Sequence, residues 1–116
     1  MNTTAIGTSH ERAAAHYLEE LGMYIVEQNW RTKWCEIDIV ARDQQGVIHI
    51  IEARYRKSEG SGNGVESITP IKQKQLIHAA KRWLMLRGAP SGIQIDVIGI
   101  NGRGDIDYIP DAVQEY

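Results

Sequence analysis

The sequence predicts a single α/β domain whose elements follow one another in the order α-β-β-β-α-β-β. Two segments combine helix-capping residues with apolar residues at helical spacing, and five others are rich in β-branched residues or alternate apolar and polar residues. The chain has 116 residues, 42% of them hydrophobic, which is enough for one domain to bury a core without a disulfide or structural metal. We expect residues 1–116 to form this one domain, because the sequence contains neither an internal repeat nor a linker long enough to separate two domains.

The first helix is expected over residues 9–21, after a loose tail at residues 1–7. Thr8 and Glu11 form a capping box, in which the threonine caps the helix and the glutamate lies three residues later. Gly22 is a suitable residue just beyond the helix end. The apolar residues that follow at helical spacing are Ala13, Ala14, Tyr17, Leu18 and Leu21.

The next three elements are expected to be strands. Residues 23–30 are β-branched and aromatic, and the runs 35–42 and 47–54 alternate apolar with polar side chains. A three-residue loop between these runs, over 44–46, puts Gly46 at the left-handed position that such loops need. Residues whose numbers add to 90 then pair across the hairpin. The charged pairs on one side of the sheet are Asp38 with Glu52 and Glu36 with Arg54.

The last elements are a helix and two strands, which follow a polar, glycine-rich loop over residues 58–66. Thr69 is an N-cap and Pro70 occupies the first helical position, and the helix is expected to end at Gly88. Its apolar stripe consists of Ile71, Leu76, Ile77, Ala80, Trp83 and Leu84. Strands are expected over 93–100 and 106–109.

The facing carboxylates of the hairpin indicate a divalent-cation site. Two carboxylates directly opposite each other repel, and Mg²⁺ is usually bound by one or two carboxylates together with other oxygen atoms and water. Asp38, Glu52 and the carbonyl of Ala53 supply such ligands. Arg54 returns to the same face and is suited to contact a phosphate, although a guanidinium cannot act as a general base.

An ordinary solvated sheet face explains most of this pattern equally well. Antiparallel sheets often carry alternating charges on one face, and Glu36 opposite Arg54 is then a simple cross-strand ion pair. The pattern alone favours this interpretation. Asp38 opposite Glu52 is the pair that it does not explain.

The composition excludes several classes of protein. Cys35 is the only cysteine, so the chain has no intramolecular disulfide and no cysteine-rich zinc site. The sequence shows no targeting segment and no apolar run long enough to span a membrane, and we expect a cytoplasmic protein without a membrane partner.

The charge is unevenly distributed. The formal net charge of -2 is not typical of a nucleic-acid-binding domain, but residues 54–87 contain eight basic and two acidic residues. The candidate nucleic-acid contacts are Arg56, Lys57, Lys72 and Lys74, with Trp34 as a candidate for stacking on a base. An ordinary solvated helix face remains the alternative for part of this basic segment.

Several strings together resemble the uncharacterised bacterial YraN family, in order, over about residues 7–113. That family is similar to the restriction-endonuclease-like PD-(D/E)xK superfamily, and most of all to archaeal Holliday-junction resolvases. The strings are Asn29-Trp30-Arg31, Glu36-Ile37-Asp38-Ile39-Val40-Ala41, Ile51-Glu52-Ala53-Arg54-Tyr55-Arg56, Ser67-Ile68-Thr69 with Lys72-Gln73, Ile95-Asp96-Val97-Ile98 and Asp111-Ala112.

The resemblance implies a restriction-endonuclease-like core, with a mixed central sheet flanked by helices, and a Mg²⁺- or Mn²⁺-dependent nuclease site. Asp38 matches the metal-binding aspartate of the superfamily, Glu52 matches the acidic residue of the E-x-K element, and Arg54 stands where that element has lysine. Glu11 resembles the glutamate of the first helix that completes the metal site, and Gln73 resembles the polar residue that orients it.

The resulting expectation is an endonuclease that hydrolyses phosphodiester bonds in DNA, including branched DNA. By analogy with resolvases, it is also expected to act as a homodimer. Glu36 belongs to the family strings without an assigned role. The alternative is a nucleic-acid-binding module that retains the fold but does not cleave.

Overall fold

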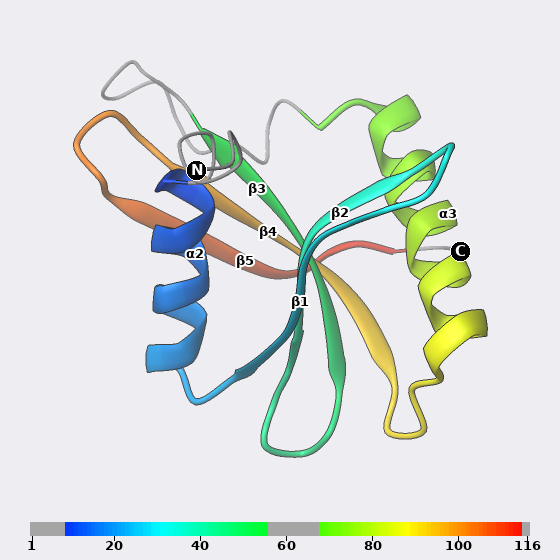
Figure 1. Cartoon of the computed structure of the whole chain (residues 1–116). Coiled ribbons are helices and arrows are strands. Elements are labelled where there is room, and N and C mark those ends of the chain that lie inside the picture. The colour runs from blue at the N-terminus through cyan, green and yellow to red at the C-terminus, as the bar shows by residue number, and fades with distance from the viewer. Residues whose placement is uncertain (1–8, 56–67, 115–116) are drawn as a thin grey trace, which may run out of the picture.

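The computed structural model describes residues 9–55 and 68–114, which form an α/β fold of three layers (Figure 1). Helix α2 (Ser9–Glu20) covers one face of a central sheet, and helix α3 (Pro70–Arg87) covers the other. The expected tail over 1–7, the cap Thr8 and the loop over 58–66 lie outside the described residues. No helix in the described ranges is long and apolar enough to cross a membrane.

The central sheet is mixed and has five strands, in the order β1-β2-β3-β4-β5. Strands β3 and β4 are parallel, and the other three neighbouring pairs are antiparallel. A parallel pair requires a crossover connection, and α3 is that connection. The strands are β1 (Tyr24–Arg31), β2 (Glu36–Arg42), β3 (Ile48–Tyr55), β4 (Ile93–Ile100) and β5 (Ile106–Val113).

The β2–β3 hairpin has the predicted register. The pairs run from Arg42 with Ile48 to Ile39 with Ile51, so the numbers of each pair add to 90. The loop closes through a hydrogen bond from the Asp43 N–H to the Val47 carbonyl at 3.0 Å. Gly46 has a φ of +88°, which is the left-handed conformation that the loop requires.

The last strand is longer than predicted. Residues 106–109 were expected as a short strand, but β5 continues to Val113. Pro110 lies within it, and Asp111 has a φ of +54°. Because β5 is an edge strand whose pairing with β4 shifts between Ile95 and Val97, it tolerates a proline that a central strand would not.

The helices bury different residues from some of those predicted. In α2, Ala15 is buried and Ala13 is exposed; Leu21, just beyond the end of α2, is exposed too, although the spacing placed both Ala13 and Leu21 in the apolar stripe. In α3, Ile71, which lies in the first turn, is also exposed. The buried residues of the two helices are Ala14, Ala15 and Leu18 in α2, and Leu76, Ala79, Ala80 and Trp83 in α3.

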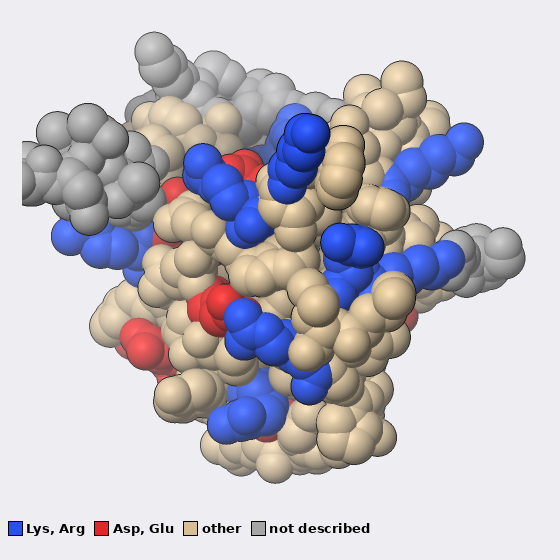
Figure 2. Space-filling model, turned by 45° about the vertical axis from the view of Figure 1, so that its right-hand side comes forward, with Lys and Arg blue, Asp and Glu red and all other residues tan. Residues whose placement is uncertain are grey.

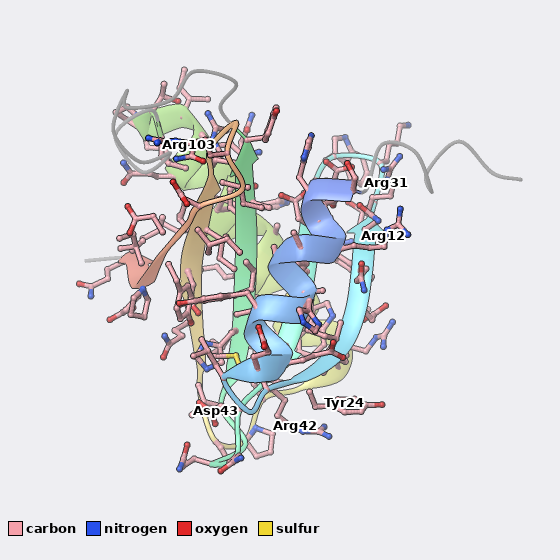
Figure 3. The ribbon with its side chains drawn as sticks, turned by 90° about the vertical axis from the view of Figure 1, so that its left-hand side faces the viewer. Arg12, Tyr24, Arg31, Arg42, Asp43 and Arg103 are labelled. Carbon is pink, nitrogen blue, oxygen red and sulfur yellow. The ribbon has the colours of Figure 1, made fainter. Side chains whose placement is uncertain are left out.

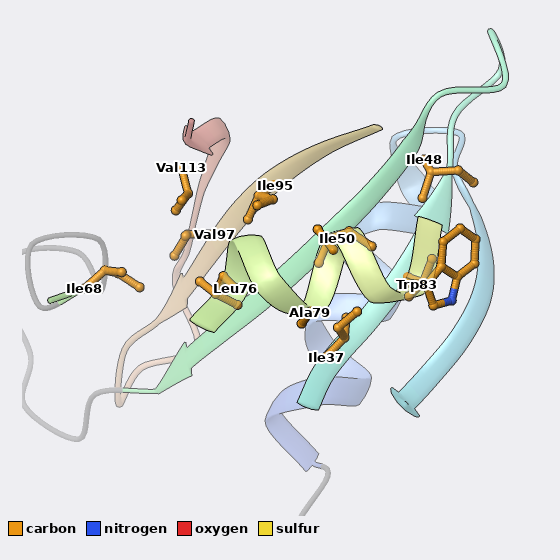
Figure 4. Close-up of a cluster of buried hydrophobic side chains, with 12 residues drawn as sticks. Ile37, Ile48, Ile50, Ile68, Leu76, Ala79, Trp83, Ile95, Val97 and Val113 are labelled. Atoms are coloured by element: carbon orange, nitrogen blue, oxygen red, sulfur yellow. The ribbon is translucent and has the colours of Figure 1, made fainter. Parts of the chain in front are cut away.

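The sheet divides the core into two clusters, one beneath α2 and one beneath α3. Ile37 belongs to the α3 cluster, although strand alternation predicts that it shares a face with Ile39, which belongs to the α2 cluster. The period of two puts Ile37 and Ile39 on the same face of β2. Ile39 packs beneath α2, but Ile37 packs with Ile50 and Trp83 beneath α3 (Figure 4). The side-chain alternation of β2 is therefore reversed at the residue between them, Asp38.

Candidate functional site

The regular pairing of the sheet is interrupted at Asp38. The β1–β2 pairing passes from Gln28–Ile39 directly to Trp30–Ile37, and the β2–β3 pairing ends at Ile39–Ile51. Asn29, the residue opposite Asp38 in β1, has a φ of +54°, a conformation that asparagine tolerates better than most residues. This local distortion explains the reversal of side-chain alternation between Ile37 and Ile39.

The Asp38 carboxylate lies where β2 and β3 separate. Its Oδ2 accepts a hydrogen bond from the Ala53 N–H at 2.9 Å, so a side chain, rather than the backbone, connects the two strands at this point. Burial raises the pKa of Asp38 to about 7, and the charge of Glu52 contributes in the same direction. The hydrogen bond from Ala53 lowers this pKa, while Glu11 and Glu36 raise it further. Asp38 is therefore at the centre of a group of mutually repelling carboxylates.

Glu52 is buried and contacts two cationic side chains. Its Oε2 is 3.2 Å from Arg54 Nη1 and 3.6 Å from Lys72 Nζ, and only 7% of its side chain is exposed. Arg54 thus lies on the predicted face. Lys72 reaches Glu52 from the first turn of α3, where its N–H donates to the Thr69 Oγ1 cap at 3.1 Å. The structure brings Lys72, predicted only as a nucleic-acid contact, to the carboxylate itself.

Glu11 enters the site from the first turn of α2. It lines a hollow of about 270 Å³ together with Asp38, Ala53 and Arg54. Burial and the nearby Glu36 raise the pKa of Glu11. The preceding residue, His10, stacks on Tyr55 at the end of β3, with ring centroids 3.7 Å apart, and this contact holds the start of α2 against the site.

Glu36 has a different partner from the one predicted. The hairpin register placed it opposite Arg54, but it forms an ion pair with Arg31 of the neighbouring strand, with Nη2 and Oε2 2.8 Å apart. The pairing of Arg31 with Glu36 at the end of the β1–β2 ladder brings these side chains together. The ion pair between Glu36 and Arg54 that the solvated-face alternative implied is therefore not found among the ion pairs of the described residues.

The remaining candidate residues lie around this centre rather than in it. The Gln73 side-chain amide donates to the Ile68 carbonyl at 3.2 Å and so holds the segment that enters α3; its role in orienting the site stays a prediction. Lys74 is exposed on α3, and Trp34 is 72% exposed beside a neighbouring hollow. Arg56 and Lys57 lie outside the described residues.

The donor atoms at the site fit a hard divalent cation. Asp38, Glu52 and the Ala53 carbonyl offer oxygen atoms, and the raised pKa of Asp38 reflects a local excess of negative charge that a cation would relieve. In residues 9–55 and 68–114, however, no three His, Cys, Asp or Glu side chains converge on a common point as a preformed cage. A divalent cation at this site would therefore need further ligands from water or substrate.

Sequence reasoning missed several residues of the site. Asn29, Arg31 and Tyr55 belong to family strings that assign them no role, and His10 belongs to none of these strings. The family strings are therefore the signal that could have directed attention to the first three residues. The φ of Asn29 and the stack of His10 on Tyr55 depend on packing between distant elements, so no local pattern shows them.

Comparisons with known proteins find relatives that share one family description, UPF0102. The model of the uncharacterised protein family UPF0102 matches residues 10–100. A UPF0102 protein of Serratia proteamaculans (strain 568) is 38% identical over 115 residues, or 97% of each chain. A UPF0102 protein of Streptomyces griseus is 38% identical over 98 residues, covering 83% of this chain and 82% of the relative. The structure of Pyrococcus furiosus SfsA in complex with Ca²⁺ covers 91% of this chain and 62% of its own; at 14% identity and a TM-score of 0.33, this likeness carries no conclusion.

Proposed function

Because this chain belongs to the uncharacterised protein family UPF0102, as the resemblance to YraN predicted, its activity has to be inferred from its site, and we propose a metal-dependent endonuclease. The reaction is hydrolysis of phosphodiester bonds in DNA, including branched DNA, and the protein acts in the cytoplasm. The observation that carries the proposal is the pair of carboxylates Asp38 and Glu52 at the break between β2 and β3, flanked by Arg54 and Lys72.

Each residue of the site has a role in this proposal. Asp38, Glu52 and the Ala53 carbonyl hold Mg²⁺ or Mn²⁺, and Glu11 adds negative charge from α2. The chemistry that the metal supplies there is stabilisation of the phosphate charge and acidification of water. Arg54 binds the phosphate and stabilises the charge that develops on it, as guanidinium groups commonly do.

Lys72 adds a second cation that the superfamily resemblance does not assign. Its ammonium group contacts the same oxygen of Glu52, Oε2, as Arg54 does, but it comes from α3 rather than from β3. In this proposal Arg54 and Lys72, which both contact Glu52 Oε2, would bind the substrate phosphate.

A cleavage assay with site variants tests the proposal. Purified protein is incubated with four-way junctions, flaps and duplexes in Mn²⁺ or Mg²⁺, and in EDTA. We expect metal-dependent cleavage that falls at least 100-fold in Asp38→Asn and Glu52→Gln, a typical loss when a catalytic charge is removed. Glu19→Gln, which changes an exposed carboxylate of α2 outside the site, is the control and should cleave normally.

Calorimetric titration with Mn²⁺ provides a second readout that does not depend on cleavage. Binding by the wild type and its loss in Asp38→Asn support the metal site. Equal Mn²⁺ binding by the wild type and both site variants contradicts it. Cleavage that persists in Asp38→Asn contradicts the catalytic assignment, whatever the titration shows.

The second candidate function is a binding module without cleavage. It is favoured by the two cations that already neutralise Glu52 and by the lack of a third converging ligand within the described ranges. Salt-sensitive binding of junctions or flaps, without cleavage under any metal condition and in protein from several preparations, identifies this module.

A further inference from the structure

A second hollow lies directly beside the carboxylate site, on the α3 side of the β1–β2 connection. It has a volume of about 350 Å³, which is larger than the hollow at Asp38. Its walls come from the segment that joins β1 to β2 and from the first two turns of α3. The residues that line it are Arg31, Thr32, Trp34, Cys35, Glu36, Lys72, Gln75 and Leu76.

The two hollows share a wall and a cation. The ion pair of Arg31 and Glu36 lines both hollows and separates them. Lys72 lines the second hollow and also contacts Glu52 of the carboxylate site. Lys72 therefore connects the second hollow to the carboxylate site at which the proposed function places a phosphate.

Trp34 gives this hollow an exposed aromatic surface on a hydrogen-bonded turn. Its side chain is 72% exposed, while its backbone N–H donates to Thr32 Oγ1 at 3.2 Å. The Cys35 N–H donates to the same oxygen at 3.2 Å, and the Thr32 N–H donates to the Cys35 carbonyl at 2.8 Å. These three bonds fix the turn that carries the indole. An exposed tryptophan on a rigid turn is a suitable platform for stacking a nucleobase.

The other walls are suited to the remaining parts of a nucleotide. The buried Leu76 forms an apolar floor, and Gln75 is an exposed amide that can donate to and accept from a base edge. Arg31 and Lys72 also line the hollow, ion-paired with Glu36 and Glu52, and we place the phosphates on either side of the nucleotide against these two cations. A base inside a duplex is stacked and paired, so only an unpaired nucleotide can present its face to Trp34 and its edge to Gln75.

We infer that this second hollow binds one unpaired nucleotide next to the phosphate held at Asp38 and Glu52, so that the substrate is a nucleic acid with single-stranded nucleotides at the cleavage position. The inference rests on the proposed function for the position of the phosphate. It narrows the substrate from branched DNA in general to strands that are unpaired at the site.

Binding measured in EDTA tests the inference separately from catalysis. Fluorescein-labelled oligonucleotides of three kinds are titrated with protein: a single strand, a duplex with a single-stranded flap, and a blunt duplex, each as DNA and as RNA. We expect Trp34→Ala to weaken binding of the single strand and the flap by about 5- to 100-fold, the range for loss of one stacked base, and to leave binding of the blunt duplex nearly unchanged.

Tyr24→Ala is the matched control. Tyr24 is also an exposed aromatic residue beside a cation, since Arg42 lies 5.1 Å from its ring just as Lys33 lies 5.6 Å from the ring of Trp34. It lies at the opposite end of β1 from Arg31 (Figure 3).

Quenching of tryptophan fluorescence by an unlabelled single strand gives a second readout. We expect this quenching in the wild type and not in Trp34→Ala.

The outcomes separate this inference from the proposed function. A selective loss in Trp34→Ala supports the unpaired-nucleotide hollow, with or without cleavage activity in Mn²⁺. Equal losses for the flap and the blunt duplex, or a loss no greater than in Tyr24→Ala, overturn it. Tighter binding of the RNA strands than of the DNA strands supports the hollow as a site for an unpaired nucleotide and identifies RNA as the preferred nucleic acid. Cleavage that requires Asp38 but does not depend on Trp34 overturns this inference and leaves the proposed function in place.

Discussion

Asp38 shows how one residue combines a structural and an electrostatic role. Its carboxylate bonds to the Ala53 N–H where the strands separate, and burial together with Glu52 raises its pKa to about 7. The hydrogen bond from Ala53 favours the ionised carboxylate of Asp38, but burial and the neighbouring carboxylates disfavour ionisation more strongly. Without a bound cation, ionised Asp38 therefore destabilises the folded state.

Asp38→Asn is expected to stabilise the metal-free protein at alkaline pH. The folded-state pKa of Asp38 is raised, so its favourable contribution is present below about pH 4 and is lost as the pH rises through about 7. Asparagine keeps an oxygen to accept from Ala53 and carries no charge. Urea unfolding in EDTA should show a gain of about 2 kcal/mol at pH 8 and a much smaller one at pH 5. An equal gain at both values contradicts the electrostatic explanation.

A second set of charged residues, outside the site, holds the other end of the sheet. His49 Nδ1 lies 2.6 Å from Asp96 Oδ2, and His49 Nε2 lies 2.8 Å from Asp43 Oδ2. Tyr108 and Gln94 donate hydrogen bonds to the fully buried Asp96. Burial alone would lower the pKa of His49, but its hydrogen bonds and charge interactions with the two aspartates raise it. Burial opposes ionisation of Asp96 as well, yet its hydrogen bonds lower its pKa.

The stabilisation from this set of residues is expected to decrease at both high and low pH. The contribution of His49 is complete below about pH 6.5 and is lost as the pH rises through its raised pKa, whereas that of Asp96 is lost as the pH falls below about 4. His49→Gln leaves the Asp96 charge without its cation and should cost about 3 kcal/mol at pH 6, measured by urea unfolding. The cost should be smaller at pH 9.

Asp43→Asn provides the control for this prediction. The Asp43 Oδ1 accepts from the N–H groups of Gln45 and Val47, and asparagine can retain both bonds in the hairpin loop. The substitution removes both the negative charge and the hydrogen-bond acceptor, Oδ2, that face His49 Nε2. We expect the pKa of His49, followed by NMR, to fall in this variant. An unchanged pKa shows that Asp43 does not contribute.

At the scale of elements, the start of α3 decides where Lys72 lies. Thr69 caps the helix by accepting from the Lys72 N–H, and Pro70 occupies the first helical position. Thr69→Ala is expected to cost about 1 kcal/mol in the free energy of unfolding, the usual value for loss of a cap. Thr69→Ser retains the hydroxyl and should cost much less. Equal losses in the two variants, measured by urea unfolding, contradict the capping role.

The hairpin shows how far element-level prediction reaches. Its register and the left-handed Gly46 were predicted correctly, because alternation and loop length are local properties. The same register was wrong for Glu36, because the alternation of β2 reverses at Asp38 and Glu36 pairs with Arg31. A pattern with a period of two cannot indicate where it breaks.

At the scale of the whole molecule, the net charge of -2 conceals a basic face. Lys and Arg side chains are spread over the side that carries α3, with fewer Asp and Glu among them (Figure 2). The helix contributes Lys72, Lys74, Lys81, Arg82 and Arg87, and none of its residues is acidic. This distribution suits a contact with phosphate groups along one side of the molecule.

The salt dependence of nucleic-acid binding tests this face. A plot of the logarithm of the binding constant against the logarithm of the salt concentration has a negative slope. If Lys74 neutralises one phosphate, the magnitude of this slope should decrease by about 0.7–0.9 in Lys74→Ala. Arg42→Ala is the control, since Arg42 lies at the far end of β1 and β2 from Arg31 (Figure 3). Equal slopes for the wild type and Lys74→Ala show that Lys74 makes no phosphate contact.

The sequence by itself determined the order of the elements, the bounds of β4, the caps of α3 and the register of the hairpin, because each depends on residues close together in the chain. It also identified Asp38, Glu52 and Arg54 as a group. Only the tertiary structure decided that Lys72 meets Glu52 and that the pKa of Asp38 is raised to about 7. The contact between Lys72 and Glu52 joins elements that are distant in sequence. The pKa of Asp38 depends on its burial and on charged neighbours from several elements, and a local sequence pattern contains information about neither.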